Sequence, residues 1–273
     1  AWASTHGARQ VMRSIGGSVD NITYLGEYTR TRIAAALSMP AASRMRRLVP
    51  GVDVDAFHPT VRDRGRELRE ELGLGSRPVV VVVSRLMPRK GQDTLIRTLP
   101  HIQRAVPDAA LLIVGGGPYR STLEKLVVEH GLGNSVVLTG TVPWSELPAH
   151  YAAGDVFAMP CRTRNRGWDV EGLGIVYLEA GAIGMPVIAG NSGGAPDAVL
   201  DGETGYVVDG RNEAQVAERV IELLSNPALA ARLGQRGREW VEQQWTWPIV
   251  SRRLTDLLDG HDPDLRHPIA GPQ

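Results

Sequence analysis

Residues 79–91 read Val-Val-Val-Val-Val-Ser-Arg-Leu-Met-Pro-Arg-Lys-Gly. The five consecutive valines predict a strand that is covered on both faces, because a strand with one face in water alternates apolar and polar residues. A helical stretch follows at once, and short apolar runs then alternate with helical stretches as far as residue 244. Strands and helices in this alternation form parallel sheets through right-handed crossovers. The sequence therefore predicts an α/β fold with a doubly wound parallel sheet.

The predicted elements follow from this alternation. The expected strands lie at 79–83, 110–114, 135–138, 156–159, 186–189 and 205–208. The expected helices lie at 91–105, 119–130, 145–153, 173–183, 196–200, 213–224 and 228–244. Before them the pattern is sparser, with strands expected at 21–25 and 48–49 and helices at 29–37 and 62–72.

Composition and charge restrict the class of protein. The chain has 273 residues, 42% of them hydrophobic and 22% charged, which is ordinary for a globular protein. A formal net charge of zero gives no reason to expect a nucleic-acid partner. The single cysteine, Cys161, excludes an intrachain disulfide, fits a reducing compartment and is expected at a buried strand end. The apolar runs are too short to span a bilayer, and because the first residue is not Met we expect a fragment.

Two carboxylates flank a glycine-rich helix start. Residues 171–179 read Glu-Gly-Leu-Gly-Ile-Val-Tyr-Leu-Glu, and the run after Gly174 predicts a helix. Glu171 then lies in the loop before the helix, and Glu179 lies about two turns into it. Gly172 and Gly174 leave backbone amides bare at the positive end of the helix, which suits a phosphate. The alternative is one solvated glutamate on a surface helix and another in a loop.

Arg85 and Lys90 follow the first predicted strand of the sheet. They lie five residues apart across a turn that contains Pro88. Ligands of such sheets bind beyond the carboxyl ends of the strands, where both side chains could converge on one anion. Arginine offers a two-pronged fork and lysine a point charge, a combination that neutralises a diphosphate. The alternative is a solvated basic loop.

Two glycine-rich turns are weaker candidates for phosphate binding. Gly115-Gly116-Gly117 follows a predicted strand and opens a helix, and Ser192-Gly193-Gly194 repeats this arrangement later in the chain. Neither is a Walker loop or a G-x-G-x-x-G fingerprint. Gly116 and Gly117 either present amides to a phosphate or serve a tight turn.

The remaining polar residues give no metal site. Asp53 and Asp55 match a D-x-D pattern but lie in an expected connector, and no spaced His/Cys cluster indicates zinc. The loop 162–169 has three arginines that either steer an anionic partner or are solvated. The histidines expected at the surface are His58, His101, His130 and His150.

These motifs, in this order, resemble those of the retaining glycosyltransferases of family 4, which have the two-domain GT-B fold. The matching segments are 84–91, 114–118, 155–160, the Glu171 and Glu179 pair, 192–196 and 202–205. Within the family the chain is similar to the actinobacterial phosphatidylinositol mannoside α-mannosyltransferases, on the segments 88–95, 146–150, 159–164, 169–174 and 237–241. The resemblance runs from about residue 3 to residue 258.

The resemblance implies an activity and its ligands. The donor would be GDP-mannose, with no other cofactor and no metal, and the acceptor would be a mannosylated phosphatidylinositol. Transfer would occur in the cytoplasm, at the inner face of the membrane.

The resemblance also assigns residues. Arg85 and Lys90 would hold the diphosphate, Glu171 would contact the donor sugar and Glu179 the ribose. The amides of Gly172, Leu173, Gly174 and Ile175 would support sugar and phosphate, and Gly116 and Gly117 are further candidates for binding the donor. The family's active-site histidine falls near His6, whose role stays open because the residues after it depart from the family pattern.

The implied domain organisation has five parts. They are a remnant of the acceptor-side Rossmann-like domain at 1–60, a connector at 61–77, the nucleotide-sugar domain at 78–244, a C-terminal helix at 245–259 and a disordered tail at 260–273. Because most of the acceptor side is missing, we expect this chain alone to be inactive in transfer. The alternatives are a relative that uses UDP-N-acetylglucosamine or UDP-glucose, and a nucleotide-binding fragment without activity. A dehydrogenase is disfavoured because no G-x-G-x-x-G follows a strand.

Overall fold

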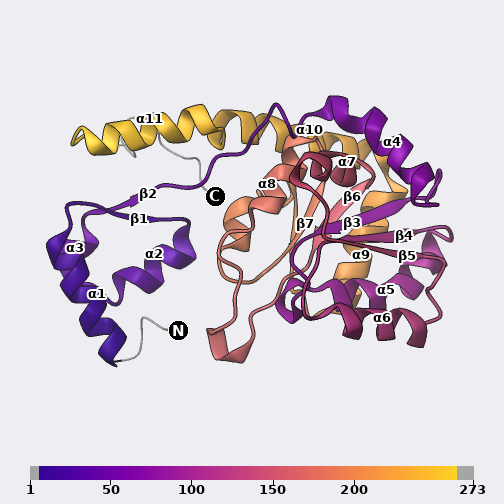
Figure 1. Cartoon of the computed structure of the whole chain (residues 1–273), viewed down its shortest axis with the longest axis horizontal. Helices are drawn as coiled ribbons and strands as arrows, with labels where there is room; N and C mark the ends of the chain where they lie inside the picture. The colour runs from indigo at the N-terminus through magenta and orange to yellow at the C-terminus, as the bar shows by residue number, and fades with distance from the viewer. Residues whose placement is uncertain (1–5, 263–273) are drawn as a thin grey trace.

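The computed structural model describes residues 6–262, most of which build one sheet domain around six parallel strands (Figure 1). The strands are β3 (Val79–Val83), β4 (Ala110–Val114), β5 (Val136–Gly140), β6 (Val156–Met159), β7 (Val187–Gly190) and β8 (Gly205–Val208). Their order in the sheet is β5-β4-β3-β6-β7-β8. This is the doubly wound order, in which the direction of winding reverses between β3 and β6. The predicted fold class is confirmed.

Helices cover both faces of the sheet. On one face α5 (Gln92–Ala105) packs against α6 (Arg120–Glu129) and α9 (Glu213–Ser225) (Figure 1). On the other face α4 (Arg62–Glu71) packs against α7 (Leu147–Ala152), and α8 (Ile175–Ala182) packs against α10 (Pro227–Gln244). Every residue of β3, β4, β6 and β7 is buried, which explains why these strands are continuous apolar runs.

Three helix predictions differ in their details. The stretch 145–153 is a 3₁₀ turn, η4 (Trp144–Glu146), that leads into α7, and 196–200 contains only the 3₁₀ turn η6 (Ala195–Ala198). Helix α8 begins at Ile175 and not at Leu173. Gly174 has a φ of 79°, a left-handed conformation that ends the preceding loop and cannot continue a helix.

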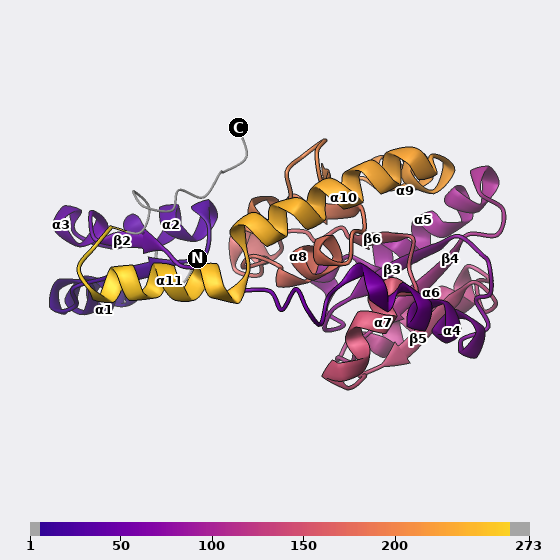
Figure 2. The same cartoon turned by 90° about the horizontal axis from the view of Figure 1, so that it is seen from above.

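The N-terminal elements form a smaller body that lies beside the sheet domain (Figures 1 and 2). It contains α1 (His6–Ser18), β1 (Ile22–Tyr24), α2 (Glu27–Ala34), α3 (Met39–Ala42) and β2 (Met45–Arg47), and its two strands are parallel. The strand expected at 48–49 lies three residues earlier, and α1 was not predicted. Helix α11 (Trp247–Leu258) runs from the end of α10 back over this body (Figures 1 and 2). Among residues 6–262, no helix has both the length and the apolarity needed to cross a bilayer.

One arginine ties the segment before α4 to the sheet domain. The Nη1 atom of Arg238 in α10 donates to the carbonyl oxygens of Val54 at 3.1 Å, Phe57 at 2.8 Å and Ala182 at 2.7 Å. Phe57 is buried, and 59–61 form the 3₁₀ turn η2 (Pro59–Val61). The guanidinium group of Arg238 and the buried side chain of Phe57 therefore both hold the segment before α4 against the sheet domain.

Replacing this arginine tests that arrangement. We expect Arg238→Met to lower the free energy of unfolding by about 2–4 kcal/mol, because three backbone carbonyls lose their donor. Arg236→Met is the control, since Arg236 has a half-exposed ion pair with Glu203 and should change stability little. Urea unfolding followed by circular dichroism measures both, and equal losses in the two variants would contradict the role given to Arg238.

Candidate functional site

The strand order places a hollow of about 400 Å³ at the carboxyl edge of the sheet. Its lining comes from the loops after β3, β4 and β5 and from helices α7 and α8: Val83, Ser84, Arg85, Val114, Gly115, Gly116, Thr141, Val142, Leu147, Ile175, Val176 and Glu179. Four residues predicted for the site, Arg85, Gly116, Ile175 and Glu179, therefore line one hollow. It lies where the winding reverses, which is the expected ligand position in such sheets.

The turn after β4 is shaped by its packing. Gly115 has a φ of 135°, and a Cβ atom there would overlap the carbonyl oxygen of Ser84. A Cβ atom at Gly117 would likewise overlap the backbone of Leu86, whose amide donates to the Gly116 carbonyl at 2.9 Å. The close approach of two loops thus accounts for Gly115 and Gly117, and only Gly116 of the predicted pair lines the hollow.

The start of α8 presents backbone amides. Gly172 is exposed, whereas the side chain of Leu173 is buried and leaves only its backbone for a ligand. The first amides of a helix have no partner within it, so those at Ile175 and Val176 can bind an anion, whereas the Tyr177 amide already donates to the Gly174 carbonyl at 3.0 Å.

Glu179 has one oxygen engaged inside the protein. Its Oε2 accepts a hydrogen bond from the Tyr151 hydroxyl at 2.6 Å, and Tyr151 itself is fully buried. Burial raises the pKa of the Glu179 carboxyl above its ordinary value, and the Tyr151 hydrogen bond opposes that rise. The Tyr151 bond leaves the other oxygen able to accept a hydroxyl from the hollow.

Lys90 and Glu171 form a buried ion pair. The Lys90 Nζ lies 2.5 Å from the Glu171 Oε2, and the two residues are 8% and 7% exposed. The Arg89 Nε lies 4.0 Å from the same oxygen, and the Arg89 Nη1 lies 3.5 Å from Asp169. From the sequence, Lys90 was expected to bind the diphosphate and Glu171 to contact the donor sugar. In the ligand-free structure the two side chains bind each other.

The loop after β7 holds Glu171 in place. The Glu171 amide donates to the Ser192 hydroxyl at 3.4 Å, and the Gly194 amide donates to the Glu171 carbonyl at 3.0 Å. Gly193 has a φ of 59°, and a Cβ atom there would overlap that carbonyl oxygen. The glycines of this loop thus serve to fix the backbone of Glu171.

The same loop reaches the N-terminal body through Asp197. The backbone amides of Glu27 and Tyr28, at the start of α2, lower the pKa of the Asp197 carboxyl. Burial raises the pKa of this carboxyl above its usual value, while Arg47 and the two amides lower it. Because a Cβ atom at Gly26 would overlap the Asp197 carboxylate, the loop that positions Glu171 also packs closely against the start of α2.

Arg162 is engaged in an internal network. Its Nη2 bonds to both oxygens of the buried Asp93 at 2.9 and 2.7 Å, and Arg97 pairs with the same carboxylate at 2.5 Å. Burial alone would raise the pKa of Asp93, but the two guanidinium groups outweigh it and hold that pKa below its ordinary value. Arg162 therefore fixes the start of the 162–169 loop and is neither solvated nor free for a ligand.

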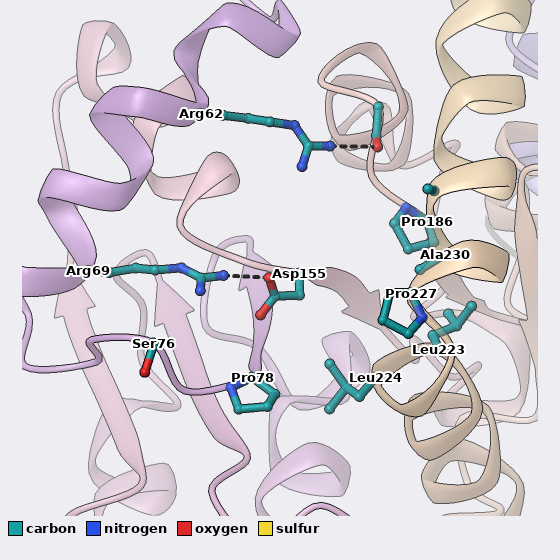
Figure 3. A pocket seen from close by; sticks show the side chains of 12 residues that line it. Arg62, Arg69, Ser76, Pro78, Asp155, Pro186, Leu223, Leu224, Pro227 and Ala230 are labelled. Atoms are coloured by element: carbon teal, nitrogen blue, oxygen red, sulfur yellow. Dashed lines mark hydrogen bonds and ion pairs between the residues drawn. The ribbon is translucent and has the colours of Figure 1, made fainter.

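A second hollow of about 350 Å³ lies at the opposite, amino edge of the sheet (Figure 3). Arg69 pairs there with Asp155 at 2.7 Å, and Asp155 also accepts the Val79 amide at 2.7 Å. Arg62 reaches the Gly184 carbonyl at 3.1 Å. None of the predicted site residues lines this hollow, and its charged groups tie α4 to the starts of the strands.

The remaining candidates have local roles. Asp53 accepts the amides of Asp55 and Ala56 in a turn, and among residues 6–262 no three potential metal ligands gather at one place. His150, expected at the surface, is buried, with its Nδ1 atom 2.8 Å from the Glu146 carbonyl. Cys161 is buried as expected. The side chain of His6 and residues 263–273, which include most of the expected tail, lie outside the described residues.

The sequence of the chain is similar to those of known proteins. Residues 65–240 match the family model described as "Glycosyl transferases group 1". A GDP-mannose-dependent alpha-(1-6)-phosphatidylinositol monomannoside mannosyltransferase of Mycolicibacterium smegmatis is 53% identical over 94% of this chain and 69% of its own length. The Mycobacterium tuberculosis protein of the same name is 54% identical, over 95% and 69%.

Solved structures share the fold. Anabaena HepE, crystallised with UDP and glucose, superposes with a TM-score of 0.83 at 21% identity, over 95% of this chain and 70% of that one. Sucrose-phosphate synthase from Thermosynechococcus elongatus gives a TM-score of 0.79 at 28% identity, over 94% and 62%.

Replacing one partner of the buried pair between Lys90 and Glu171 should change the stability of the protein. Lys90→Met should lower the free energy of unfolding by about 3 kcal/mol, because it leaves the Glu171 carboxylate buried without a counter-ion. The double variant Lys90→Met/Glu171→Gln should recover most of that loss. Lys125→Met, at an exposed lysine of α6, should be close to neutral. If the double variant is as unstable as Lys90→Met, the loss of stability does not come from an unpaired Glu171 carboxylate.

Proposed function

The chain belongs to the group 1 glycosyl transferases, and on that premise we propose that it transfers mannose from GDP-mannose to a phosphatidylinositol mannoside with retention of the anomeric configuration. The observation that carries the proposal is the 53–54% identity, over 94–95% of the chain, to mannosyltransferases named for this donor and acceptor. The hollow at the carboxyl edge of the sheet supports it, because cationic, amide and carboxylate groups meet there.

We propose the following placement of the donor. Arg85 binds the diphosphate, together with the free amides at the start of α8 from Gly172 to Ile175. The carboxylate of Glu179 accepts the ribose hydroxyls at the inner end of the hollow. Glu171 accepts hydroxyls of the mannose, and Lys90 adds its charge to the diphosphate.

Catalysis in this proposal is mainly electrostatic. The transition state resembles an oxocarbenium ion, and negative charge grows on the leaving diphosphate. Groups fixed in advance against such a charge supply the largest catalytic contribution in many enzymes. Arg85, Lys90 and the α8 amides have this role, and Glu171 orients the sugar. Because these cations neutralise the diphosphate, we propose that donor binding needs no added metal.

The acceptor side is proposed from the relatives. Their acceptor is a lipid, so we propose that the reaction takes place at a membrane surface, with the protein in the cytoplasm and peripheral at the inner leaflet. The single reduced cysteine agrees with that compartment.

Donor selectivity tests the proposed function. Calorimetry should show that GDP-mannose binds more tightly than UDP-glucose or UDP-N-acetylglucosamine, with or without EDTA. Joined to the preceding segment of the Mycobacterium tuberculosis relative, the chain should also transfer radiolabelled mannose to phosphatidylinositol monomannoside. Tighter binding of either UDP sugar, or no transfer by the joined protein, would contradict the proposal.

The diphosphate role of Arg85 gives a second measurement. Arg85→Ala should weaken GDP binding by about 1.5–3 kcal/mol, the range for hydrogen bonds to charged groups, and leave guanosine binding nearly unchanged. Arg120→Ala is the matched control, because Arg120 is engaged with Glu124 and does not line the hollow. If guanosine and GDP lose affinity equally, Arg85 has a structural role.

The ribose role of Glu179 predicts a pH dependence. A protonated carboxyl is a poorer acceptor, so GDP affinity should fall as the pH drops through the raised pKa of Glu179. Tyr151→Phe removes the hydrogen bond that lowers this pKa, so the fall should begin at higher pH in the variant. Tyr206→Phe removes a similar bond, to Glu222 outside the hollow, and is the control. Identical profiles for Tyr151→Phe and the unaltered protein would count against Glu179.

A further inference from the structure

Lys90 and Glu171 occupy each other in the ligand-free chain. Their charged atoms lie 2.5 Å apart, both residues are more than nine-tenths buried, and neither lines the hollow that holds Arg85. Buried charges of opposite sign are stable together, and either one is costly if its partner leaves. A diphosphate that is bound by Arg85 in the hollow can therefore contact the Lys90 ammonium only if this group turns away from Glu171.

We propose that Glu171 competes with the donor diphosphate for Lys90, and that this competition makes the site prefer an intact nucleotide sugar over a free nucleoside diphosphate. The inference rests on the proposed function, because it takes the ligand positions from it. It adds a role for Glu171 that contact with the sugar alone does not contain. Glu171 then helps the site to distinguish an intact nucleotide sugar from a free nucleoside diphosphate.

The preference follows from what each ligand offers Glu171. Free GDP takes Lys90 but provides nothing that donates to the carboxylate, so Glu171 stays buried without a hydrogen-bond partner for its charge. An intact sugar nucleotide takes Lys90 and brings hydroxyl groups that donate to Glu171 in place of the ammonium. The intact donor consequently replaces every bond that it breaks. The product nucleotide does not, which weakens its binding and favours its release.

The surroundings of Glu171 offer no replacement for its bond with Lys90. Ser192 and Gly194 hold its amide and carbonyl, so the backbone of Glu171 stays in place when Lys90 turns toward the hollow. Arg89 is the nearest other cation, but its Nε lies 4.0 Å away, beyond hydrogen-bond distance, and its Nη1 lies near Asp169. Arg89 thus reduces the electrostatic penalty without replacing the bond from Lys90.

The affinities of the two ligands, measured by calorimetry without acceptor, test the competition. Glu171→Gln keeps the shape and removes the charge that holds Lys90. GDP should therefore bind the variant roughly tenfold more tightly than the unaltered chain, as expected for the release of one charged hydrogen bond. GDP-mannose should gain less or lose affinity, because its hydroxyls lose a charged acceptor. The preference for GDP-mannose over GDP should shrink.

Asp169→Asn is the matched control. It removes one negative charge from the same loop without touching Lys90, so it measures the general effect of charge on an anionic ligand. A gain for GDP that is larger in Glu171→Gln than in Asp169→Asn supports the competition, provided that thermal unfolding shows both variants folded. Lys90→Met, which removes the contested group, should abolish the gain when it is combined with Glu171→Gln.

Three results would overturn the inference. GDP affinity that is unchanged or weaker in Glu171→Gln would show that the carboxylate does not compete, while the proposed function would stand. Equal gains in the two carboxylate variants would reduce the effect to bulk charge. Failure of the unaltered chain to bind either GDP or GDP-mannose would refute the proposed function and this inference together.

Discussion

Strand β3 is buried on both faces and hydrogen-bonded on both edges, and its central position decides where the rest of the chain lies. A parallel strand cannot be joined to its neighbour by a tight turn, so most connections cross a face of the sheet as a helix, and the β7–β8 connection is a longer loop with the 3₁₀ turn η6. The chain winds outward from β3 through β4 to β5 on one side, then returns and winds through β6 to β8 on the other. The loops after β3 and β6 diverge from that point, and the hollow that contains Arg85 and Glu179 forms beside them.

Long-range pairs then fix the loops at that edge. Asp93 holds Arg162, the loop after β7 holds Glu171, and Lys90 pairs with Glu171 across the site. Each contact gives a buried charge or backbone group a partner and so avoids the cost of leaving it unpaired. The loops are therefore ordered before any ligand binds. The arrangement also means that a ligand which needs Lys90 must exchange one favourable contact for another.

The sequence predicted the sheet well because buried parallel strands are short continuous apolar runs, such as 79–83 and 110–114. In the small N-terminal body it located β1 and most of α2 but misplaced β2, which contains Arg46 and Arg47 and so lacks an apolar signature. In the site, the residue types and their strand-end positions were readable from local sequence. The partners were not: Lys90 and Glu171 are 81 residues apart, and Asp93 and Arg162 are 69 apart. Such pairing depends on how the loops meet, which no local pattern encodes.

A crystal structure of the chain with GDP-mannose tests the central claim most directly. The account predicts the diphosphate between Arg85 and the start of α8, the ribose on Glu179, and the Lys90 ammonium turned from Glu171 toward phosphate oxygens while mannose hydroxyls take its place. A donor bound at the amino edge near Arg62, or a donor in the hollow with the Lys90 and Glu171 contact unchanged and no sugar on Glu171, would contradict it.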